Sequence, residues 1–473
     1  LLPGWRDEHS GFVREVLNRK VVPHDTYFLT ASRALHIPSP LVPGTSGKDS
    51  NCTVSIADLA AWLAEKASGL GAGVYCGFAA AAPLIENGCV KGVVLRARGL
   101  GHDGNKRENY LPEEIIRAKV TILADGVCGP VSTQVIQALR LDAGRNPQTY
   151  SIGLKQLLKL PSRDHKGQSR VIQTFGYPHR LNVFGGGFIY DMGASEMAVG
   201  LVVGLDWPYY DLNPQQELEL FKAHPLIART LADTEIVAAG AKMIPEGGLY
   251  SMPKLYGNGV MLAGDAAGMV NLVKLKGIHL AVRAGMSAGL TAVEALARGD
   301  ISAGALAAYD DLLRQSGLYK ELSDARNMRQ CFMTPLGLLL GAPMTMVQRF
   351  IPLRLPIKGD RQSTKRRSIR RAYEAPFDRK TFAARSGAMH DENILSHIFI
   401  RDEKVCLDCI RNIGGPCTCF CPVEVYSFND RRTGIAISST DCIHCRSCAV
   451  KCPMDNIDWK TPEGGFGPRF RRM

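Results

Sequence analysis

The chain has 473 residues, of which 45% are hydrophobic and 22% are charged. This balance is typical of a globular protein with two or three domains and excludes an intrinsically disordered chain. Lysine and arginine exceed aspartate and glutamate by 12, which favours an anionic partner such as a membrane surface or an acidic protein. The sequence has no uninterrupted run of 18 apolar residues, so we expect no membrane-spanning helix.

The first clear helical pattern covers residues 55–67. Ile56, Leu59 and Leu63 recur at helical spacing, and Asp58 lies in the predicted first turn. The glycine-rich residues 68–75 come after this helix and before a strand. A dinucleotide-binding fingerprint requires its glycines between a strand and the helix that faces the phosphates. We therefore interpret these glycines as a helix C-cap. The start of the chain shows no basic-then-apolar leader, so we expect a location on the cytosolic side.

Two short β-branched runs, at residues 92–98 and 119–124, predict strands on either side of a polar hairpin loop. The second run leads into Asp125 and Gly126. Further along, residues 259–268 predict a buried strand that turns through small side chains into a helix rich in alanine and glycine. Small residues at such a turn let the backbone approach a ligand closely.

The following segments differ in character. Residues 150–205 are rich in β-forming side chains and predict a second sheet. Residues 332–357 are apolar and broken by prolines, which is typical of a surface that dips into a membrane rather than of a long helix. The basic run at residues 365–371 has no interleaved aromatic side chains, so it favours a membrane or protein partner over nucleic acid. A merely solvated face is the remaining interpretation.

Nine of the fourteen cysteines lie between residues 406 and 452, which indicates a metal centre. The downstream half matches the C-x2-C-x2-C-x3-C-P run that holds iron–sulfur clusters in bacterial ferredoxins. Its cysteines are Cys442, Cys445, Cys448 and Cys452. The upstream half has an enlarged loop and also closes on Cys-Pro. Its cysteines are Cys406, Cys409, Cys417 and Cys421.

In a two-cluster ferredoxin, the fourth cysteine of each half binds the cluster of the other half. Cys421 is therefore expected to complete a first [4Fe-4S] cluster with Cys442, Cys445 and Cys448. A second cluster would take Cys406, Cys409, Cys417 and Cys452, and Cys419 is left spare. Zinc is the main alternative, but a zinc site needs only four ligands. The other cysteines are interpreted as buried small hydrophobic residues: Cys52, Cys76, Cys89, Cys128 and Cys331.

The cysteine pattern occurs together with further motifs. They are residues 147–155 (PQTYSIGLK), residues 200–206 (GLVVGLD), Glu246-Gly247-Gly248, residues 456–459 (NIDW) and residues 462–465 (PEGG). With these motifs the sequence resembles the electron-transfer-flavoprotein:quinone oxidoreductase family and the related nitrogen-fixation-associated flavoprotein fused to its ferredoxin-like partner. Single-cluster members of the family match only the first set of four cysteines, so the second set indicates an added cluster.

The resemblance implies a fold of the α/β and α+β classes. A Rossmann-like FAD-binding domain of the glutathione-reductase type would carry an inserted β-rich quinone domain, and a ferredoxin-like domain would follow. The expected parts are residues 1–148 and 246–330 for FAD binding, 149–245 for quinone binding, 331–392 for a membrane-associated segment and linker, and 393–473 for the clusters. The family's N-terminal glycine fingerprint is not found, so we expect the first FAD-binding part to be truncated.

The resemblance also implies the cofactor residues. Gly264 and Asp265 correspond to the second flavin motif, in which the carboxylate binds the sugar-alcohol chain of FAD. The expected FAD-binding residues are Asp125, Gly126, Gly264, Asp265, Ala267 and Gly268. Gly185 and Gly186 match the family position that lines the quinone pocket.

The implied function is electron transfer from a reduced electron transfer flavoprotein, through the clusters and FAD, to ubiquinone or menaquinone. The implied location is peripheral, on the cytosolic or matrix face of the cytoplasmic or inner membrane. No catalytic acid, base or nucleophile is needed. One alternative is a geranylgeranyl-reductase-like flavoenzyme, because such enzymes share the Gly-Asp motif. Another is an electron-relay fragment without flavin.

Overall fold

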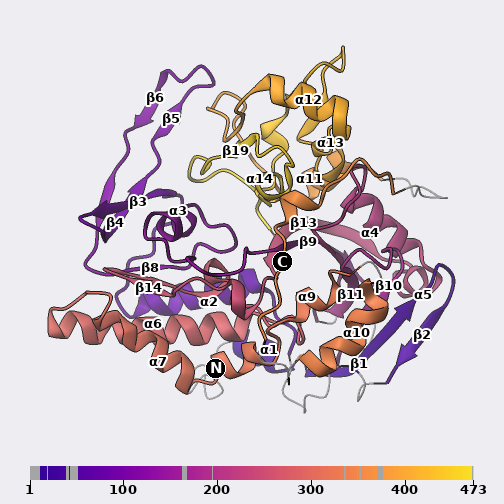
Figure 1. Ribbon diagram of the computed structural model, residues 1–473, viewed down its shortest axis with the longest axis horizontal. Helices are drawn as coiled ribbons and strands as arrows, with labels where there is room; N and C mark the ends of the chain where they lie inside the picture. Colours follow the sequence, from indigo (N-terminus) through magenta and orange to yellow (C-terminus); the bar gives the residue numbers. More distant parts are fainter. Residues whose placement is uncertain are drawn as a thin grey trace.

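The computed structural model describes residues 11–18, 20–38, 42, 52–161, 168–193, 195–334, 337–348, 350, 353–369, 377–470 and 472. These residues form three units that lie against one another (Figure 1). We call them the large-sheet unit, the small-sheet unit and the cysteine-rich unit. The chain alternates between the first two before it enters the third.

The large-sheet unit is built on one seven-stranded sheet with the order β13-β9-β12-β11-β10-β1-β2. Its strands are β1 (Lys20–Leu29), β2 (Ala34–Ile37), β9 (Tyr150–Lys159), β10 (Gln168–Gly176), β11 (Gly185–Asp191), β12 (Glu196–Gly204) and β13 (Glu235–Pro245). Strands β9 and β12 lie inside the sheet and bury most of their side chains, which explains their near-continuous apolar sequences. This sheet confirms the one predicted for residues 150–205. Strands β1 and β2 extend it, so residues 20–37 pair with this unit.

Helices lie against the large sheet. They are α4 (Pro214–Ala223), α5 (Pro225–Thr230), α9 (Met328–Phe332) and α10 (Gly337–Gln348). The first helix, α1 (Gly11–Asn18), instead contacts the small-sheet unit, because its Phe12 ring stacks on Trp62 with the ring centres 5.5 Å apart. Asn213 accepts hydrogen bonds from the first amides of α4, which then packs on β9 and β12. Among the described residues of the segment 332–357, the helix after α9 is α10 with 12 residues, so no long helix forms there, as predicted, although Pro343 lies inside α10.

The small-sheet unit contains the strand order β14-β15-β8, with β8 (Thr121–Leu123), β14 (Tyr256–Gly257) and β15 (Val260–Leu262). β15 and β8 are parallel, with Leu262 opposite Leu123. The carboxyl ends of parallel strands meet at one edge of a sheet. The turns that follow the two strands are therefore brought together. The helices of this unit are α2 (Ile56–Gly69), α3 (Pro130–Ala138), α6 (Ile278–Arg298), α7 (Ala308–Gln315) and α8 (Leu318–Ser323).

Helix α2 confirms the helix predicted for residues 55–67. Ser55 caps it by accepting a hydrogen bond from the amide of Asp58. The glycines that follow lie in the turn after the helix. The strand β15 does not lead directly into a long helix as expected, because a single 3-10 turn (Gly264–Ala267) and a loop come before α6.

Among the described residues, α6 is the helix that is long and apolar enough to cross a membrane. Its inward face, which includes Leu280, Ala284 and Ala288, belongs to the core of the small-sheet unit. Its other face is exposed and carries Leu290, Val293 and Leu296, so only one side of the helix belongs to the core.

The expected hairpin between residues 92–98 and 119–124 is wrong. Strand β4 (Cys89–Leu95) pairs with β3 (Ala80–Glu86) and β7 (Ile115–Arg117), whereas β8 belongs to the other sheet. The polar segment between them was interpreted as a loop, but it forms a ribbon of β5 (Arg98–Leu100) and β6 (Lys106–Leu111) that projects from the unit (Figure 1).

The cysteine-rich unit consists of short elements. They are α11 (Arg379–Arg385), β16 (Ile398–Ile400), α12 (Glu403–Ile413), α13 (Cys417–Phe420), β17 (Tyr426–Phe428), β18 (Ile435–Ile437), α14 (Ser447–Lys451) and β19 (Ile457–Trp459). β16 pairs with β19 and β17 pairs with β18, both antiparallel. Such short strands are not stable alone, so the unit depends on its contacts with the rest of the chain.

One set of contacts comes from the β5–β6 ribbon. Its Arg107 forms an ion pair with Asp391 at 2.6 Å, and its His102 amide donates to the Asn393 carbonyl at 2.9 Å. The amide of Gly99 donates to the Glu463 carboxylate at 3.0 Å, and both groups are buried. Glu463 belongs to the PEGG motif, so this motif joins the cysteine-rich unit to the ribbon.

A second set of contacts comes from α14. Lys451 is fully buried, and its Nζ donates to the Trp207 carbonyl at 2.8 Å and to Ser363 Oγ at 3.1 Å. The ammonium group also lies 4.7 Å from the centre of the Trp207 ring. Apolar residues of the cysteine-rich unit and of the large sheet belong to one hydrophobic core.

We predict that Lys451→Met lowers the free energy of unfolding by about 1–3 kcal/mol, because it leaves the buried Trp207 carbonyl with only the long contact from Ser363 Oγ at 3.5 Å. Thermal unfolding of the intact chain measures the change. Lys404→Met is the matched control, because Lys404 is exposed on α12. An equal unfolding temperature for both variants would show that Lys451 does not anchor the unit.

Candidate cofactor sites

A cavity of about 410 Å³ lies where the small sheet meets the large one. One wall is the turn after β15, which contributes Asp265, Ala267 and Gly268. The facing wall comes from α3 and from the PQTYS motif, and it includes Cys128, Ser132, Asn146, Gln148 and Tyr150. The volume lies in the usual range for small-molecule sites.

The turn after β15 has the geometry of a ligand-binding loop. Gly264 and Gly268 have φ angles of 65° and 74°, which are left-handed and favour glycine. A Cβ atom on Gly268 would lie 2.4 Å from Gln148 Nε2, so only glycine fits between the cavity and Gln148. Burial raises the pKa of Asp265, so a polar partner inside the cavity would stabilise its carboxylate.

Asp125 and Gly126 lie in the turn after the other parallel strand, β8, as expected, but Asp125 has a different contact. Its carboxylate accepts hydrogen bonds from the amides of Val131 and Ser132 at 2.9 and 3.0 Å, and so caps the start of α3. Asp125 thus positions the helix that forms one cavity wall. Gly126 has a φ angle of 76° at the turn into that helix.

These residues fit an FAD molecule in part. Asp265 provides a carboxylate, and the turn through Gly268 provides a backbone that a ligand can approach closely. A side chain in place of these glycines would occupy the space that the cofactor needs. In that arrangement Gly264, Asp265, Ala267 and Gly268 would hold the cofactor directly, and Asp125 and Gly126 would support it through α3.

Gly185 and Gly186 lie at the start of β11, between β10 and β12. A Cβ atom on Gly185 would lie 2.0 Å from the Val202 carbonyl oxygen, and one on Gly186 would lie 2.3 Å from the Thr174 carbonyl oxygen. Close packing of the strands therefore requires glycine at both positions. Strand packing thus explains the two glycines independently of their expected role in quinone binding.

The first set of cysteines comes together at the inner side of the cysteine-rich unit. Cys421, Cys442, Cys445 and Cys448 are all buried, with at most 8% of their surface exposed. Burial and the neighbouring thiolates raise the pKa of Cys448 to about 12 and that of Cys421 to about 11. Four thiolates can share this site only with a strongly cationic partner, as in an iron–sulfur cluster.

The second set of cysteines also comes together. Cys406, Cys409, Cys417 and Cys452 line one cavity together with apolar side chains such as Ile410. Cys406 and Cys409 project from the same face of helix α12, because they are three positions apart. Burial, followed by the charges of Cys452 and Cys406, raises the pKa of Cys409 to about 12. The donor set again fits a cationic cluster.

The two halves are related by an internal repeat that extends beyond the cysteines. Cys421 and Cys452 each precede a proline, and each sulfur accepts a hydrogen bond at 3.4 Å from the amide four residues later, in Val425 and Asn456. Residues 424 and 455 both have positive φ angles. The exchange of cysteines between the halves thus follows from two equivalent turns.

Cys419 lies on the short helix α13, and its sulfur is 3.8 Å from Thr418 Oγ1. The charges that act on it come from Arg379 and Asp211, whereas those that act on Cys417 come from four other cysteines. This contrast agrees with the interpretation of Cys419 as the spare thiol.

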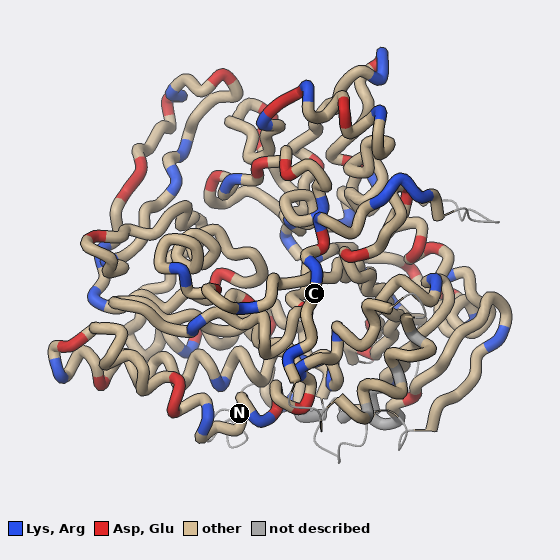
Figure 2. The backbone as a smooth tube through the Cα atoms, in the orientation of Figure 1, with Lys and Arg blue, Asp and Glu red and all other residues tan. Residues whose placement is uncertain are grey.

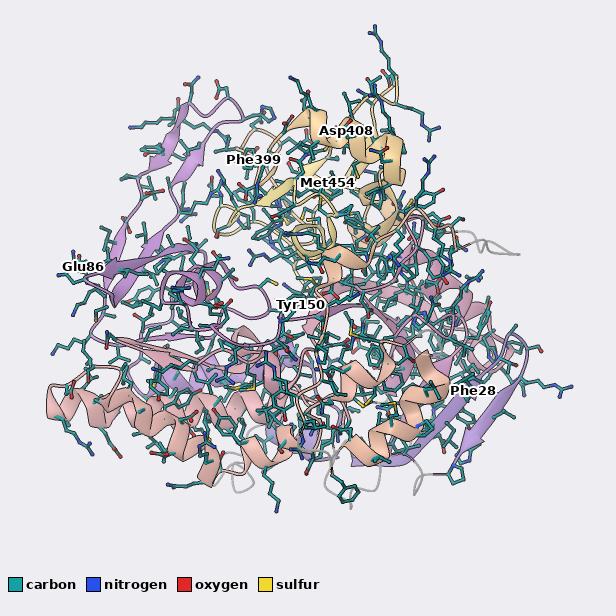
Figure 3. The ribbon with its side chains drawn as sticks, in the orientation of Figure 1. Phe28, Glu86, Tyr150, Phe399, Asp408 and Met454 are labelled. Atoms are coloured by element: carbon teal, nitrogen blue, oxygen red, sulfur yellow. The ribbon has the colours of Figure 1, made fainter. Side chains whose placement is uncertain are left out.

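A link between the first cysteine set and the cavity was not expected from the sequence. Arg446, in the loop between Cys445 and Cys448, is close enough to Cys128 and Tyr150 to interact with them electrostatically, and its guanidinium carbon is 4.2 Å from the Trp459 ring centre. Tyr150 lies where the three units meet (Figure 3). The loop that carries the cysteines therefore lies within electrostatic range of residues of the cavity wall.

The interpretation of five scattered cysteines as buried hydrophobic residues is partly wrong. Cys331 is buried, but Cys76 is exposed and Cys52, Cys89 and Cys128 are partly exposed. Cys128 has a functional position, because it lines the cavity and forms a side-chain hydrogen bond with Tyr150. No pattern in the sequence joins Cys128 to Tyr150, because the two residues belong to different predicted elements.

Comparisons with known proteins agree with this geometry. Residues 374–471 match a family model described as "Electron transfer flavoprotein-ubiquinone oxidoreductase, 4Fe-4S", and residues 150–244 match one described as "ETF-QO, ubiquinone-binding". The chain is 34% identical to the probable mitochondrial electron transfer flavoprotein-ubiquinone oxidoreductase of Schizosaccharomyces pombe, with 99% of this chain and 76% of the relative covered. It is 32% identical to that of Pseudomonas aeruginosa, with 100% and 88% covered.

Among solved structures, a geranylgeranyl bacteriochlorophyll reductase-like protein from Thermoplasma acidophilum has a TM-score of 0.53 and 18% identity. The match covers 75% of this chain and 81% of that one. The likeness concerns the fold alone. It supports the expected fold class, a flavoprotein-like α/β body with an added β-rich sheet.

We predict that Cys445→Ala removes about four iron atoms per chain, because one cubane loses a ligand. Cys419→Ala is the matched control and should keep all of the iron. Iron and acid-labile sulfide are measured after anaerobic purification. Equal iron content in the two variants would contradict the assignment of ligands.

We further predict that Asp265→Ala reduces bound FAD at least about tenfold, because a hydrogen bond to a buried carboxylate is worth about 1.5–3 kcal/mol. Released flavin per chain is the measurement. Asp300→Ala is the control, since Asp300 is exposed beyond α6. Undiminished flavin in Asp265→Ala would remove this residue from the site.

Proposed function

Because the chain belongs to the electron transfer flavoprotein-ubiquinone oxidoreductase family, we propose that it accepts electrons from a reduced electron transfer flavoprotein and passes them to a membrane quinone. The observation that carries the proposal is the presence of two cysteine sets and one cavity in one chain, with Arg446 of the first set within electrostatic range of Cys128 and Tyr150 in the cavity wall. When bound, [4Fe-4S] clusters transfer single electrons and FAD collects two, which matches the two-electron reduction of a quinone.

The two cysteine sets differ in how deeply the chain buries them. The first cysteine set is fully buried, whereas Cys406 and Cys417 of the second set are partly exposed. The second set thus lies nearer the surface, and electrons from a docked protein would enter there. Helix α12, with Asp408 on its surface, forms part of this outer side (Figure 3).

The hydrogen bonds to sulfur favour the reduced state of a cluster, because they offset the added negative charge. Cys442 accepts one from the amide of His444 at 3.4 Å, and Cys406 accepts one from Asn456 Nδ2 at 3.2 Å. Ser447 Oγ is 3.2 Å from Cys445 Sγ. Both sets therefore have side-chain or backbone donors.

We propose two clusters in this chain rather than one. Purified anaerobically, the chain is expected to contain about eight iron and eight sulfide per molecule, four for each cubane. A value of about four would leave one cluster on Cys421, Cys442, Cys445 and Cys448. It would also make the cavity around the second cysteine set a purely structural feature.

The membrane surface is proposed at α10 and the loop after it. This region lies at the lower edge of the molecule, on the side away from the cysteine-rich unit (Figure 1). It exposes a group of large apolar side chains: Leu339, Leu340, Met344, Val347, Phe350 and Leu353. Exposed apolar patches of this kind mark interaction sites, including membranes. Quinone would enter from this side, toward the strand that carries Gly185 and Gly186.

The basic run has a different position. Lys365, Arg366 and Arg367 are exposed beside the cysteine-rich unit and form a continuous blue stretch in Figure 2. The Asp211 carboxylate accepts a hydrogen bond from the Ile369 amide at 2.8 Å and so fixes the end of this stretch. Residues 370 and 371 of the run lie outside the described residues. Its place near the cysteines favours a protein partner over the membrane.

We predict that replacing Leu339, Leu340 and Val347 together with glutamine releases the chain from quinone-containing vesicles, because the apolar surface that enters the lipid is lost. Co-sedimentation with vesicles is the measurement. The control replaces Leu290, Val293 and Leu296, which are exposed on α6, with glutamine. Unchanged sedimentation of the α10 variant would contradict the proposed membrane face.

A reductase of isoprenoid double bonds is the other class of function that shares this fold. The cysteine-rich unit, which lies within the residues 374–471 matched by the 4Fe-4S family model, has no role in such a reaction unless it supplies electrons. Reduction of a prenyl lipid without reduction of a short-chain quinone analogue would favour that class instead. Clusters without flavin in the purified chain would favour an electron-relay role.

A further inference from the structure

Three histidines from separate segments converge beside the first cysteine set. They are His390, His397 and His444, and one ring nitrogen from each lies within 4.8 Å of the others. The ring centres of His397 and His444 are 5.0 Å apart, and that of Trp459 lies 5.6 and 5.7 Å from them. The imidazole rings of these histidines have no part in holding a cluster or FAD as described above; only the backbone amide of His444 donates to Cys442.

The hydrogen bonds of the three rings identify the available nitrogens. His390 Nε2 is 2.9 Å from the Cys442 carbonyl oxygen. A carbonyl only accepts, so His390 Nε2 carries the proton and His390 Nδ1 keeps its lone pair. The Nε2 atoms of His397 and His444 are buried and have no hydrogen-bond partner among the described groups. Only 3% of the surface of His397 is exposed.

Buried nitrogens without partners are costly, and their presence usually marks a water or an ion that satisfies them. Three neutral imidazoles are the ligand set of zinc and of similar divalent cations. Two ligands of a tetrahedral zinc ion are about 3.4 Å apart, given a Zn–N distance of about 2.0–2.1 Å. Binding would therefore draw the ring nitrogens together by up to about 1.4 Å.

The surroundings hold the rings in place. Gly467 packs on His444 so closely that a Cβ atom there would lie 2.4 Å from its Cε1 atom. The backbones of Met389 and Gly467 exchange two hydrogen bonds, at 3.0 and 2.8 Å, which fix the segment that carries His390. The cluster loop, the segment before β16 and the chain end thus meet at the histidines.

We propose that His390, His397 and His444 bind one divalent cation of the zinc type. The ion ties the segment before the first cysteine of the unit to the loop that carries Cys442 and Cys445. Its ligands are three nitrogens and one further group, for which a water is sufficient. The site is distinct from the cysteine sets because its donors are imidazole nitrogens alone.

The test is metal analysis of the full chain, purified anaerobically and without metal-affinity chromatography. We expect about one zinc per chain in addition to the iron. X-ray absorption at the zinc edge should show nitrogen or oxygen neighbours at about 2.0–2.1 Å and no sulfur at about 2.3 Å. A sulfur shell would place the zinc in an empty cysteine site and overturn the proposal, as would zinc below about one tenth per chain.

Variants separate the site from the rest of the molecule. His397→Ala should lower zinc at least tenfold while iron stays unchanged. His224→Asn is the matched control, because His224 is also buried with an unpartnered Nε2, and asparagine can still cap α5 through its side-chain oxygen. Zinc retained in His397→Ala would overturn the proposal. If His397→Ala does not fold, the absorption spectrum of the unmodified chain decides by itself.

Discussion

The arrangement of sites depends on one packing interaction, the contact of the cysteine-rich unit with the large sheet. The unit has only pairs of short strands, so it is held by the shared hydrophobic core and by Lys451 against Trp207. This contact places Arg446 of the cluster loop beside Tyr150 and Cys128 at the cavity. Without it, the cysteines and the cavity would be separate sites with no fixed distance for electron transfer.

The parallel pairing of β8 and β15 assembles the cavity in the same way that the first contact positions the cysteines. It brings the turn at Asp125 and the turn at Asp265 to one edge of the sheet. Asp125 then positions α3, and α3 and the turn after β15 form facing walls. The cavity is thus set by strand pairing. The cysteine-rich unit and α10 lie at opposite sides of the molecule (Figure 1), which separates the proposed entry of electrons from the proposed quinone side.

Local patterns in the sequence predicted what depends on local spacing. The cysteine spacing predicted both sets, because each pair of ligands sits on one turn or one helix. The helix at residues 55–67 followed from its apolar period and its Ser55 cap. The β5–β6 ribbon was missed because its polar residues are stabilised by Asp391 and Glu463, which lie hundreds of positions away.

The same reason explains the missed site residues. Cys128, Tyr150 and Arg446 meet only after three units have packed, and single positions of this kind have no pattern. The three histidines are separated by 7 and 47 positions, so no metal-binding spacing joins them in the sequence. Asp125 was found by its motif, but its contact with the amides of α3 could be seen only in the structure.

The central claim is that electrons enter through the cysteine-rich unit and reach the cavity by way of the Arg446 loop. Rapid mixing of the full chain with a reduced electron transfer flavoprotein tests it most directly, with freeze-quench EPR for the iron–sulfur signal and absorbance for the flavin. The account predicts that the reduced cluster signal appears before the flavin of this chain is bleached. Flavin bleached while the clusters remain oxidised would contradict it.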